Sequence, residues 1–396
     1  MHSHPFLMPT LRPHQQTAVD ALSQHRLGQC IFPTGAGKTL VGIMDAVKQF
    51  EKGPATIVVV APRILLAHQL CSEYLEVIKN AAVMHVHSGE TDHFRSTNPK
   101  IIRKWCDYAD DKKLVFTTYH SLHKVQEAEV DVHTIYFDEA HNSVSKRFFP
   151  AVEHFSQEAG RCYYFTATPK HSLTINKPGM NDPEVYGQVI ANVPATKMVE
   201  QGYILPPKVV VQKLDMVEDK KMIAERDASN MLTTIDDNCL NKVLICARST
   251  RQITKLVGES DFCRELHMRG YSWMYITSKT GAVIDGQKVD RDTFFKTLND
   301  WGKNPTKRFV VMHHSILAEG INVTGLEAVL FLRKMDYIGI SQSIGRVIRL
   351  GGIDKKFGMV CVPVYDKVGI STAKSVQAVV DTVFEKGEAA VSVVKR

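Results

Sequence analysis

The chain has 396 residues, a net charge of +7 and 44% hydrophobic residues, a composition typical of a soluble globular protein. This length exceeds one ordinary hydrophobic core, so two domains are expected. No run of about 18 consecutive apolar residues is present, which argues against a membrane-spanning helix. Residues 1–8 lack the basic start and long apolar core of a secretory signal. We therefore expect an intracellular, cytoplasmic protein, in the nucleoid or host cytoplasm if the source is bacterial or phage, and the positive charge favours a polyanionic partner.

Eight cysteines and 17 histidines raise the question of disulfides and metal sites. The cysteines lie far apart, mostly inside apolar runs as at Cys30, and form no Cys-x-x-Cys pair. They are predicted to be reduced core residues. The pairs His85/His87 and His313/His314 have no carboxylate or thiol companion at ligand spacing. A transition-metal site is therefore not expected.

Two cycles of apolar strand and amphipathic helix predict two α/β units. The strands expected in the first unit are Gln29–Phe32, Thr56–Ala61, Ala82–His87, Lys113–Thr117, Thr134–Asp138 and Cys162–Thr166. Helices are expected between them, including Leu40–Phe50, and Leu65–Lys79 with its apolar residues at helical spacing. His171–Pro207 contains five prolines and several glycines, which is typical of a linker.

The second unit is expected to begin at Lys208–Gln212 and to continue through a polar, helical stretch from Glu218 to Asn241. Further strands are predicted at Lys242–Ala247, Ser272–Thr277, Arg308–His313, Ala328–Leu332 and Gly358–Val364. Thr280–Val289 is rich in turn residues and is expected to be a surface loop or short insertion. Apolar residues at helical spacing from Ser371 onward predict one closing helix. The predicted boundaries are a first domain at 1–185, a linker at 186–207, a second domain at 208–370 and a C-terminal helix or tail at 371–396.

The run Phe32-Pro-Thr-Gly-Ala-Gly-Lys-Thr39 lies between an expected strand and an expected helix. Its small residues let the backbone curl around phosphates with the N–H groups pointing inward, and the helix N-terminus adds positive potential. The lysine can reach the β- and γ-phosphates of a nucleotide, and the threonine can offer a hydroxyl to Mg²⁺. The predicted contacts are Pro33, Thr34, Gly35, Ala36, Gly37, Lys38 and Thr39. The strict pattern has glycine where this chain has Phe32.

Asp138-Glu-Ala-His141 follows the apolar stretch Thr134–Phe137. A pair of carboxylates directly after a buried strand is costly unless it has a function. Asp138 is placed to hold the same Mg²⁺, directly or through water, and Glu139 is the candidate base for the attacking water. Together with the phosphate loop, this run predicts a nucleoside triphosphatase.

Gln342-Ser-Ile-Gly-Arg-Val-Ile-Arg349 places two arginines three residues apart, on one face of a predicted helix. Many surface helices carry such a pair without a function. Because the other unit has a phosphate loop, we interpret Arg346 and Arg349 as fingers that stabilise γ-phosphate charge across an interdomain cleft.

The order of these motifs resembles superfamily 2 helicases and translocases over nearly the whole chain. The resemblance implies an α/β fold of two tandem RecA-like domains, each a mainly parallel sheet flanked by helices. Further runs resemble the family's remaining motifs in order: Leu11–Gln15 (the adenine-reading motif), Val60–Ile64 (motif Ia), Thr117–Ser121 (the next strand-contacting motif), Thr166–Pro169 (motif III), Leu244–Arg248 (motif IV), Leu317–Val323 (motif V) and Gln342–Arg349 (motif VI).

The resemblance also implies a role for individual residues. Catalytic roles are assigned to Lys38, Asp138, Glu139, Gln342, Arg346 and Arg349. ATP binding is assigned to Arg12, Gln15, the phosphate loop and Gly320, and Mg²⁺ binding to Thr39 and Asp138. Nucleic-acid contacts are assigned to Pro62, Arg63, Thr117, Thr118, Arg248 and Ser249, for each of which ordinary loop capping is the alternative. Coupling of the two domains is assigned to His141, Thr166, Thr168, Glu319 and Asn322, although Asn322 stands where aspartate is common.

Several details favour one branch of the superfamily. Phe32-Pro33, Thr166-Ala-Thr-Pro169, Gln342-Ser343 and Glu200–Pro206 resemble restriction-enzyme motor subunits and phage or repair DNA helicases more than RNA-unwinding DEAD-box proteins. We therefore predict an ATP-driven motor on duplex or branched DNA, with a separate protein partner that supplies substrate choice. An RNA helicase and a nucleotide-gated clamp that binds nucleic acid without unwinding it remain as alternatives.

Overall fold

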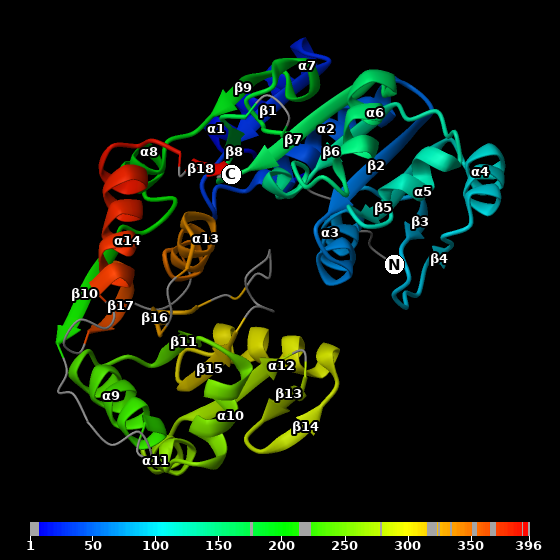
Figure 1. The fold of residues 1–396 in the computed structure, drawn as a ribbon. Coiled ribbons are helices and arrows are strands. Elements are labelled where there is room, and N and C mark those ends of the chain that lie inside the picture. Colours follow the sequence, from blue (N-terminus) through cyan, green and yellow to red (C-terminus); the bar gives the residue numbers. More distant parts are fainter. Residues whose placement is uncertain are drawn as a thin grey trace. The chain divides into compact units, whose positions relative to one another are not determined.

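The computed structural model describes residues 8–174, 177–213, 223–277, 279–314, 323, 325–332, 335–350, 355–364, 370–389 and 391–394. The chain divides into two compact units: unit 1 is Met1–Val193 together with Val391–Arg396, and unit 2 is Pro194–Ala390. Within the described residues, each unit contains an eight-stranded, mainly parallel sheet flanked by helices (Figure 1). This architecture confirms the predicted fold class of tandem RecA-like domains.

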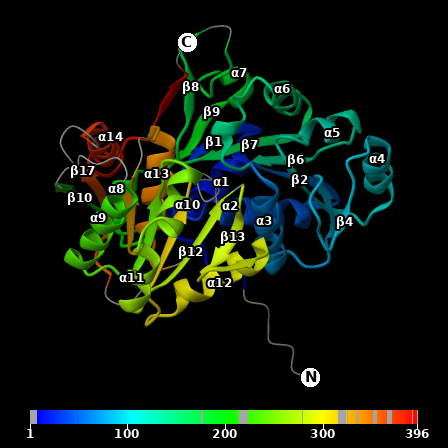
Figure 2. The ribbon, with the colours of Figure 1, turned by 60° about the horizontal axis from the view of Figure 1, so that its bottom comes forward.

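The sheet of unit 1 has the strand order β4-β3-β5-β2-β6-β7-β1-β9, of which the part from β2 to β9 can be followed in Figure 2. All neighbouring strands in it pair in parallel. The strands are β1 (Leu27–Ile31), β2 (Ala55–Ala61), β3 (Ala82–Val86), β4 (Phe94–Arg95), β5 (Lys112–Thr118), β6 (Thr134–Phe137), β7 (Arg161–Thr166) and β9 (Gln188–Asn192). Because the strands are parallel, their carboxyl ends meet at one edge, where ligands of open α/β sheets bind.

Helices cover both faces of this sheet. One face packs against α1 (Pro13–Gln24), α2 (Lys38–Lys52) and α3 (Ile64–Val77), as the contact between Tyr74 and Phe116 shows. The other face forms a core with α4 (Pro99–Tyr108), α5 (Leu122–Glu127), α6 (Phe149–Glu158) and the short α7 (Pro183–Tyr186). Successive side chains of β2 point to opposite faces of the sheet, and those of Val58 and Val60 pack in the core with α4 to α7.

A buried ion pair fixes α2 on the sheet. Asp45 of α2 is fully buried, and its two carboxylate oxygens accept bonds of 2.8 and 2.9 Å from the guanidinium of Arg161 on β7. The hydroxyl of Tyr136 on β6 donates to the same carboxylate, and Arg161 also donates to Leu22 O of α1. A buried charge that loses its partner typically costs about 3–5 kcal/mol. This pair therefore holds the helix whose first turn forms part of the phosphate loop.

The sheet of unit 2 has the order β10-β17-β16-β11-β15-β12-β13-β14. Its strands are β10 (Pro207–Lys213), β11 (Lys242–Cys246), β12 (Ser272–Thr277), β13 (Gly281–Ile284), β14 (Gln287–Val289), β15 (Phe309–His313), β16 (Ala328–Phe331) and β17 (Gly358–Val364). The pairings from β10 to β12 are parallel, and those of β13 are antiparallel. The helices of this unit are α8 (Ala195–Glu200), α9 (Ile223–Asp237), α10 (Thr250–Gly258), α11 (Phe262–Met268), α12 (Arg291–Lys303), α13 (Tyr337–Val347) and α14 (Ile370–Val380).

The segment predicted as a linker is structured. In the described residues, β9 completes the sheet of unit 1, whereas α8 and β10 belong to unit 2, and the division falls between Val193 and Pro194. Two of the five prolines that indicated a linker begin helices instead. Pro183 lies in the first turn of α7, and Pro194 is the N-cap of α8. Proline is tolerated there because the first helical N–H groups have no partner within the helix.

Two further predictions, of a loop or short insertion and of a C-terminal helix, hold only in part. Thr280–Val289 contains the hairpin β13–β14, whose turn residues Asp285 and Gly286 both have positive φ angles, of 44° and 87°. Asp-Gly is a strong hairpin signal because both turn residues adopt left-handed backbone. The closing helix is present: α14 runs to Val380 and continues directly into a π-helical turn (η3, Asp381–Glu385). Beyond it, β18 (Ser392–Val394) pairs with β8 (Lys170–Ser172) in unit 1, which was not predicted.

All eight cysteines lie in the described part of the chain and none forms a disulfide; six of them are buried. Cys239 is exposed and Cys263 is partly exposed. Within the described residues, no helix combines the length and apolar character needed to cross a membrane.

Candidate nucleotide site

The phosphate loop connects β1 to α2 at the carboxyl edge of the unit 1 sheet. Gly35 and Gly37 have φ angles of 90° and 79°, in the left-handed region that favours glycine. The loop is anchored at its start, where Phe32 N donates to Thr166 O over 3.0 Å. Helix α2 begins directly after Gly37, at Lys38. The first amides of α2 therefore lie at the loop, as a phosphate site requires.

Two residues of the first motif support this loop. The Gln15 amide nitrogen donates to Ala36 O and Gly37 O over 3.3 and 3.4 Å, and its oxygen accepts a bond from Arg12 N. His14 Nε2 donates to Ala36 O over 2.9 Å. A Cβ atom at Gly37 would lie 2.2 Å from Gln15 Nε2 and would displace that side chain from the loop. The structure thus brings Gln15 to the loop, with the Arg12 backbone bonded to its side chain, and adds His14, a residue of the same motif that had no predicted role.

Lys38 and Glu139 meet at this edge. Lys38 Nζ lies 3.7 Å from Glu139 Oε1, and the two side chains are only 11% and 10% exposed. Glu139 follows β6 and has a φ angle of 45°, an uncommon conformation for a residue with a side chain. The main-chain and side-chain amides of Asn142 hold it there by donating to Glu139 O. Such conformations cluster at functional sites, where the surrounding structure maintains them.

Asp138 directly follows β6, and both its backbone N–H and its carbonyl are hydrogen-bonded. Its N–H donates to Val60 O, and its carbonyl accepts a bond from Tyr119 Oη over 2.9 Å. Removal from water and the neighbouring carboxylate of Glu139 raise the pKa of Asp138, and Lys38 opposes this shift. A bound cation would offset the repulsion between the carboxylates of Asp138 and Glu139. The residues present therefore fit Mg²⁺, which Asp138 and Thr39 of the first turn of α2 would hold.

The predicted coupling residues of unit 1 form one buried network. His141 Nδ1 lies 3.1 Å from Thr166 Oγ1 and 3.4 Å from Thr168 Oγ1, and Thr168 N donates to Thr166 Oγ1. The same His141 nitrogen lies 3.5 Å from Glu139 Oε2. The network therefore joins the ends of β6 and β7 to the candidate base. Glu319, Gly320 and Asn322 lie outside the described residues.

The predicted nucleic-acid contacts differ in exposure. Thr117 and Thr118 are buried, and the Thr117 hydroxyl donates to Val86 O, so these side chains do not present hydroxyls at the surface. Pro62 is buried as well. The Ser249 side chain caps α10 by accepting a bond from Gln252 N. Arg63 and Arg248 are exposed and remain the candidates for phosphate contacts.

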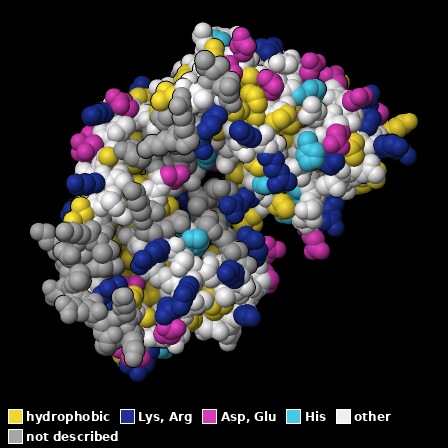
Figure 3. Space-filling model, in the orientation of Figure 1, with side chains coloured by type: hydrophobic (Ala, Val, Ile, Leu, Met, Phe, Trp, Pro, Cys, Tyr) yellow, Lys and Arg dark blue, Asp and Glu magenta, His cyan; other side chains and the backbone are white. Residues whose placement is uncertain are grey.

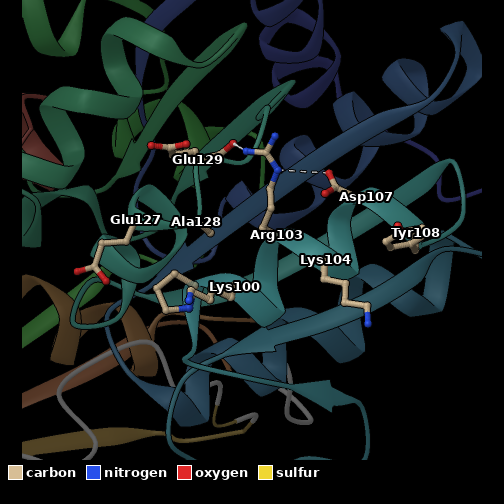
Figure 4. Close-up of a pocket in the computed structure, with 9 residues that line it drawn as sticks. Lys100, Arg103, Lys104, Asp107, Tyr108, Glu127, Ala128 and Glu129 are labelled. Atoms are coloured by element: carbon tan, nitrogen blue, oxygen red, sulfur yellow. Dashed lines mark hydrogen bonds and ion pairs between the residues drawn. The ribbon is translucent and has the colours of Figure 1, made fainter.

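The face drawn in Figure 3 carries side chains of both charges. Lys and Arg side chains are scattered over its coloured part with acidic side chains among them. An open pocket lies on α4 and α5 of unit 1 (Figure 4), where Arg103 pairs with Asp107 at 3.4 Å and Glu127 and Glu129 lie nearby. Charges of both signs line it, and none of the predicted site residues does.

In unit 2, motif VI is only partly helical. Gln342 and Arg346 lie in α13, both are buried, and Arg346 Nη1 donates to Gln342 O over 2.8 Å. Arg349 lies beyond the end of α13 and forms an isolated antiparallel bridge with Ile204. The prediction that Arg346 and Arg349 share a helical face is therefore wrong. The bridge and the bond from Leu205 N to Ile348 O extend the backbone where a further helical turn was expected.

The first half of the chain matches a known protein family. Residues 8–171 match the family model described as type III restriction enzyme, res subunit. The predicted resemblance to superfamily 2 motors of restriction enzymes is confirmed. The match covers the phosphate loop, the Asp138-Glu139 pair and motif III, and it supports a helicase-like motor ATPase. No curated protein matches the chain by sequence.

Two solved structures of DNA-bound restriction enzymes share the fold. The ATP-dependent type ISP restriction-modification enzyme LlaBIII, bound to DNA, is 20% identical with a TM-score of 0.75, over 98% of this chain and 31% of the other. A nuclease-deletion mutant of the type ISP enzyme LlaGI, in complex with a DNA substrate mimic, is 21% identical with a TM-score of 0.69, over 97% of this chain and 30% of the other. The chain thus spans about a third of the length of these enzymes, and the likeness establishes the fold.

Proposed function

We propose that this chain is an ATP-driven translocase or helicase that acts on duplex or branched DNA. The observation that carries the proposal is the meeting of Lys38 and Glu139 at 3.7 Å, beside Asp138, at the phosphate-loop edge of a parallel sheet. These are the side chains that nucleotide hydrolysis needs, at the edge where such sheets bind ligands.

In this proposal the ion pair between Lys38 and Glu139 changes when ATP binds. The β- and γ-phosphates attract Lys38, which leaves the Glu139 carboxylate available to a water molecule. Glu139 takes a proton from that water as its oxygen attacks the γ-phosphorus; the bond to the bridging oxygen breaks, and ADP and phosphate leave. Thr39 and Asp138 would hold Mg²⁺, which would offset the phosphate charge.

We propose that unit 2 contributes Arg349, with Arg346 and Gln342, to hydrolysis, and that the His141–Thr166–Thr168 network passes the state of the nucleotide to the rest of unit 1. Alternating grip on phosphates by the two units would then move the DNA. The exposed Arg63 and Arg248 suit such a grip because phosphate contacts need no base identity. The match to a restriction-enzyme family supports DNA as the partner, and both solved relatives were determined with DNA or a DNA mimic.

The test is ATP turnover measured across a panel of nucleic acids: duplex DNA, branched DNA, single-stranded DNA, duplex RNA and single-stranded RNA. We expect the strongest stimulation by duplex or branched DNA, and a fall in stimulation as salt rises, because phosphate contacts release counterions. Stronger stimulation by RNA than by any DNA would replace the proposal with an RNA helicase. Turnover that no nucleic acid changes would contradict a nucleic-acid motor.

A further inference from the structure

A cluster of histidines lies under α3, away from the nucleotide site. We call His68, His85, His87, His93 and Cys71 the histidine cluster. His85 of β3 and His87 just beyond it alternate along the chain and share the face that α3 covers. His68 and Cys71 lie three residues apart on α3, one turn from each other. No metal was expected at His85 and His87 because no further ligand stands at a suitable spacing along the chain; the fold supplies further ligands from α3.

The side chains of this cluster converge. The ring centres of His68, His85 and His87 lie 5.0–5.2 Å from one another, and one ligand nitrogen from each lies within 4.8 Å of the others. A second set, Cys71, His85 and His93, meets the same limit. Two nitrogens on a tetrahedral zinc ion with bonds of about 2.05 Å are about 3.4 Å apart. Small rotations of the imidazole rings would bring the ligand nitrogens from within 4.8 Å of one another to the spacing that zinc requires.

The protonation pattern leaves one buried nitrogen without a partner. His85 and His87 are 1% and 2% exposed. Gly89 N donates to His87 Nδ1, so that nitrogen carries no proton and His87 Nε2 does; His87 Nε2 then donates to His85 Nδ1 over 2.9 Å. The proton of His85 therefore lies on Nε2, which is buried and has no hydrogen-bond partner among the described residues. A buried N–H group without a hydrogen-bond partner destabilises the fold.

Metal binding would exchange the hydrogen bond between His85 and His87 for bonds to the ion, because a nitrogen that binds a metal carries no proton. Cys71 would have to lose its thiol proton to join, since the thiolate is the form that binds a metal. We therefore regard the three histidines as the principal ligands.

We propose that His68, His85 and His87 bind one late first-row transition-metal ion of the Zn²⁺ class, with the fourth position taken by Cys71, His93 or water. Imidazole ligands suit Zn²⁺, Co²⁺, Ni²⁺ and Cu²⁺, and the absence of a carboxylate from the cluster argues against Mg²⁺ or Ca²⁺. The ion would join α3 to the edge of the sheet formed by β3 and β4. Arg63, the N-cap residue of α3, is one of the two exposed candidates for phosphate contacts. The metal would therefore rigidify the helix that carries one of the residues proposed to hold the DNA backbone.

The experiment uses the full chain, stripped with a chelator and then titrated with Zn²⁺ or Co²⁺. Wild-type protein should bind one tightly held equivalent, Co²⁺ should show the visible absorption of four-coordinate cobalt, and Zn²⁺ should raise the thermal unfolding midpoint. A sulfur-to-cobalt charge-transfer band would report Cys71 as the fourth ligand; its absence would leave His93 or water. His68→Ala and His87→Ala should each lose the tight equivalent, and His68→Ala, at a half-buried position, is the safer variant for folding.

Two controls separate this site from other histidines. His123→Ala, at an exposed position of α5, should keep the tight equivalent. His2→Ala/His4→Ala removes histidines near the N-terminus and should keep it as well. The proposal is overturned if stripped wild-type protein binds no equivalent, if both His68→Ala and His87→Ala keep it while circular dichroism shows them folded, or if only His2→Ala/His4→Ala loses it.

Discussion

Glu139→Gln is expected to lower ATP turnover by about 10²–10⁴-fold, the contribution typical of a general base. The amide keeps the shape of the side chain but cannot accept the proton of the attacking water. Nucleotide binding should persist or tighten, because Lys38, now 3.7 Å from the Glu139 carboxylate, would no longer be attracted to it. The measurement pairs steady-state phosphate release with the affinity for a fluorescent ATP analogue.

Glu129→Gln is the matched control. Glu129 also has a left-handed backbone, with a φ angle of 51°, but it is exposed at the end of α5. The same chemical change there should leave turnover at the wild-type rate. If Glu139→Gln keeps full turnover, Glu139 is not the base, and the assignment of the nucleotide site to this edge fails with it.

Arg349→Ala is expected to lower ATP turnover by about 10³-fold or more, the range measured for arginine fingers. The guanidinium would offset charge that develops on the γ-phosphate only as the bond breaks, so ATP affinity should change far less than turnover. Arg349→Lys should rescue little of the loss, because an ammonium lacks the planar fork of donors. Arg349 is the better test position because Arg346 is almost fully buried and its truncation risks unfolding.

Arg264→Ala is the control for the loss of an arginine in unit 2. Arg264 lies on α11 with a 66% exposed side chain and pairs with Asp261 at the surface. Such pairs contribute little to stability, so this variant should match wild type in turnover and folding. Wild-type turnover of a folded Arg349→Ala variant would remove the arginine from the catalytic residues and leave hydrolysis to unit 1 and other groups.

The long strands could be predicted from the sequence because they are continuous apolar runs bounded by polar residues. The strand predicted at Thr56–Ala61 is β2 at Ala55–Ala61 in the structure. The strand predicted at Ser272–Thr277 is β12, with the same bounds. Strands buried on both faces show this signal strongly. The phosphate loop was predictable for a different reason, since its glycines, lysine and threonine lie next to each other along the chain.

The rest depended on contacts between distant residues or on backbone detail. Gln15 supports the phosphate loop from 21 residues away, and the histidine cluster combines a helix with a strand. The end of α13 before Arg349 is set by a bridge to Ile204, which no helical pattern reveals. The hairpin at Asp285-Gly286 was the exception: its turn signal was present in the sequence and was overlooked.

The most direct test of the central claim is displacement of a third strand from a DNA triplex by the isolated protein. A motor that moves along duplex DNA should release the strand only with hydrolysable ATP, and Glu139→Gln should release none while still binding DNA. ATP turnover that is stimulated by duplex DNA without any strand release would contradict translocation and would indicate a nucleotide-gated clamp.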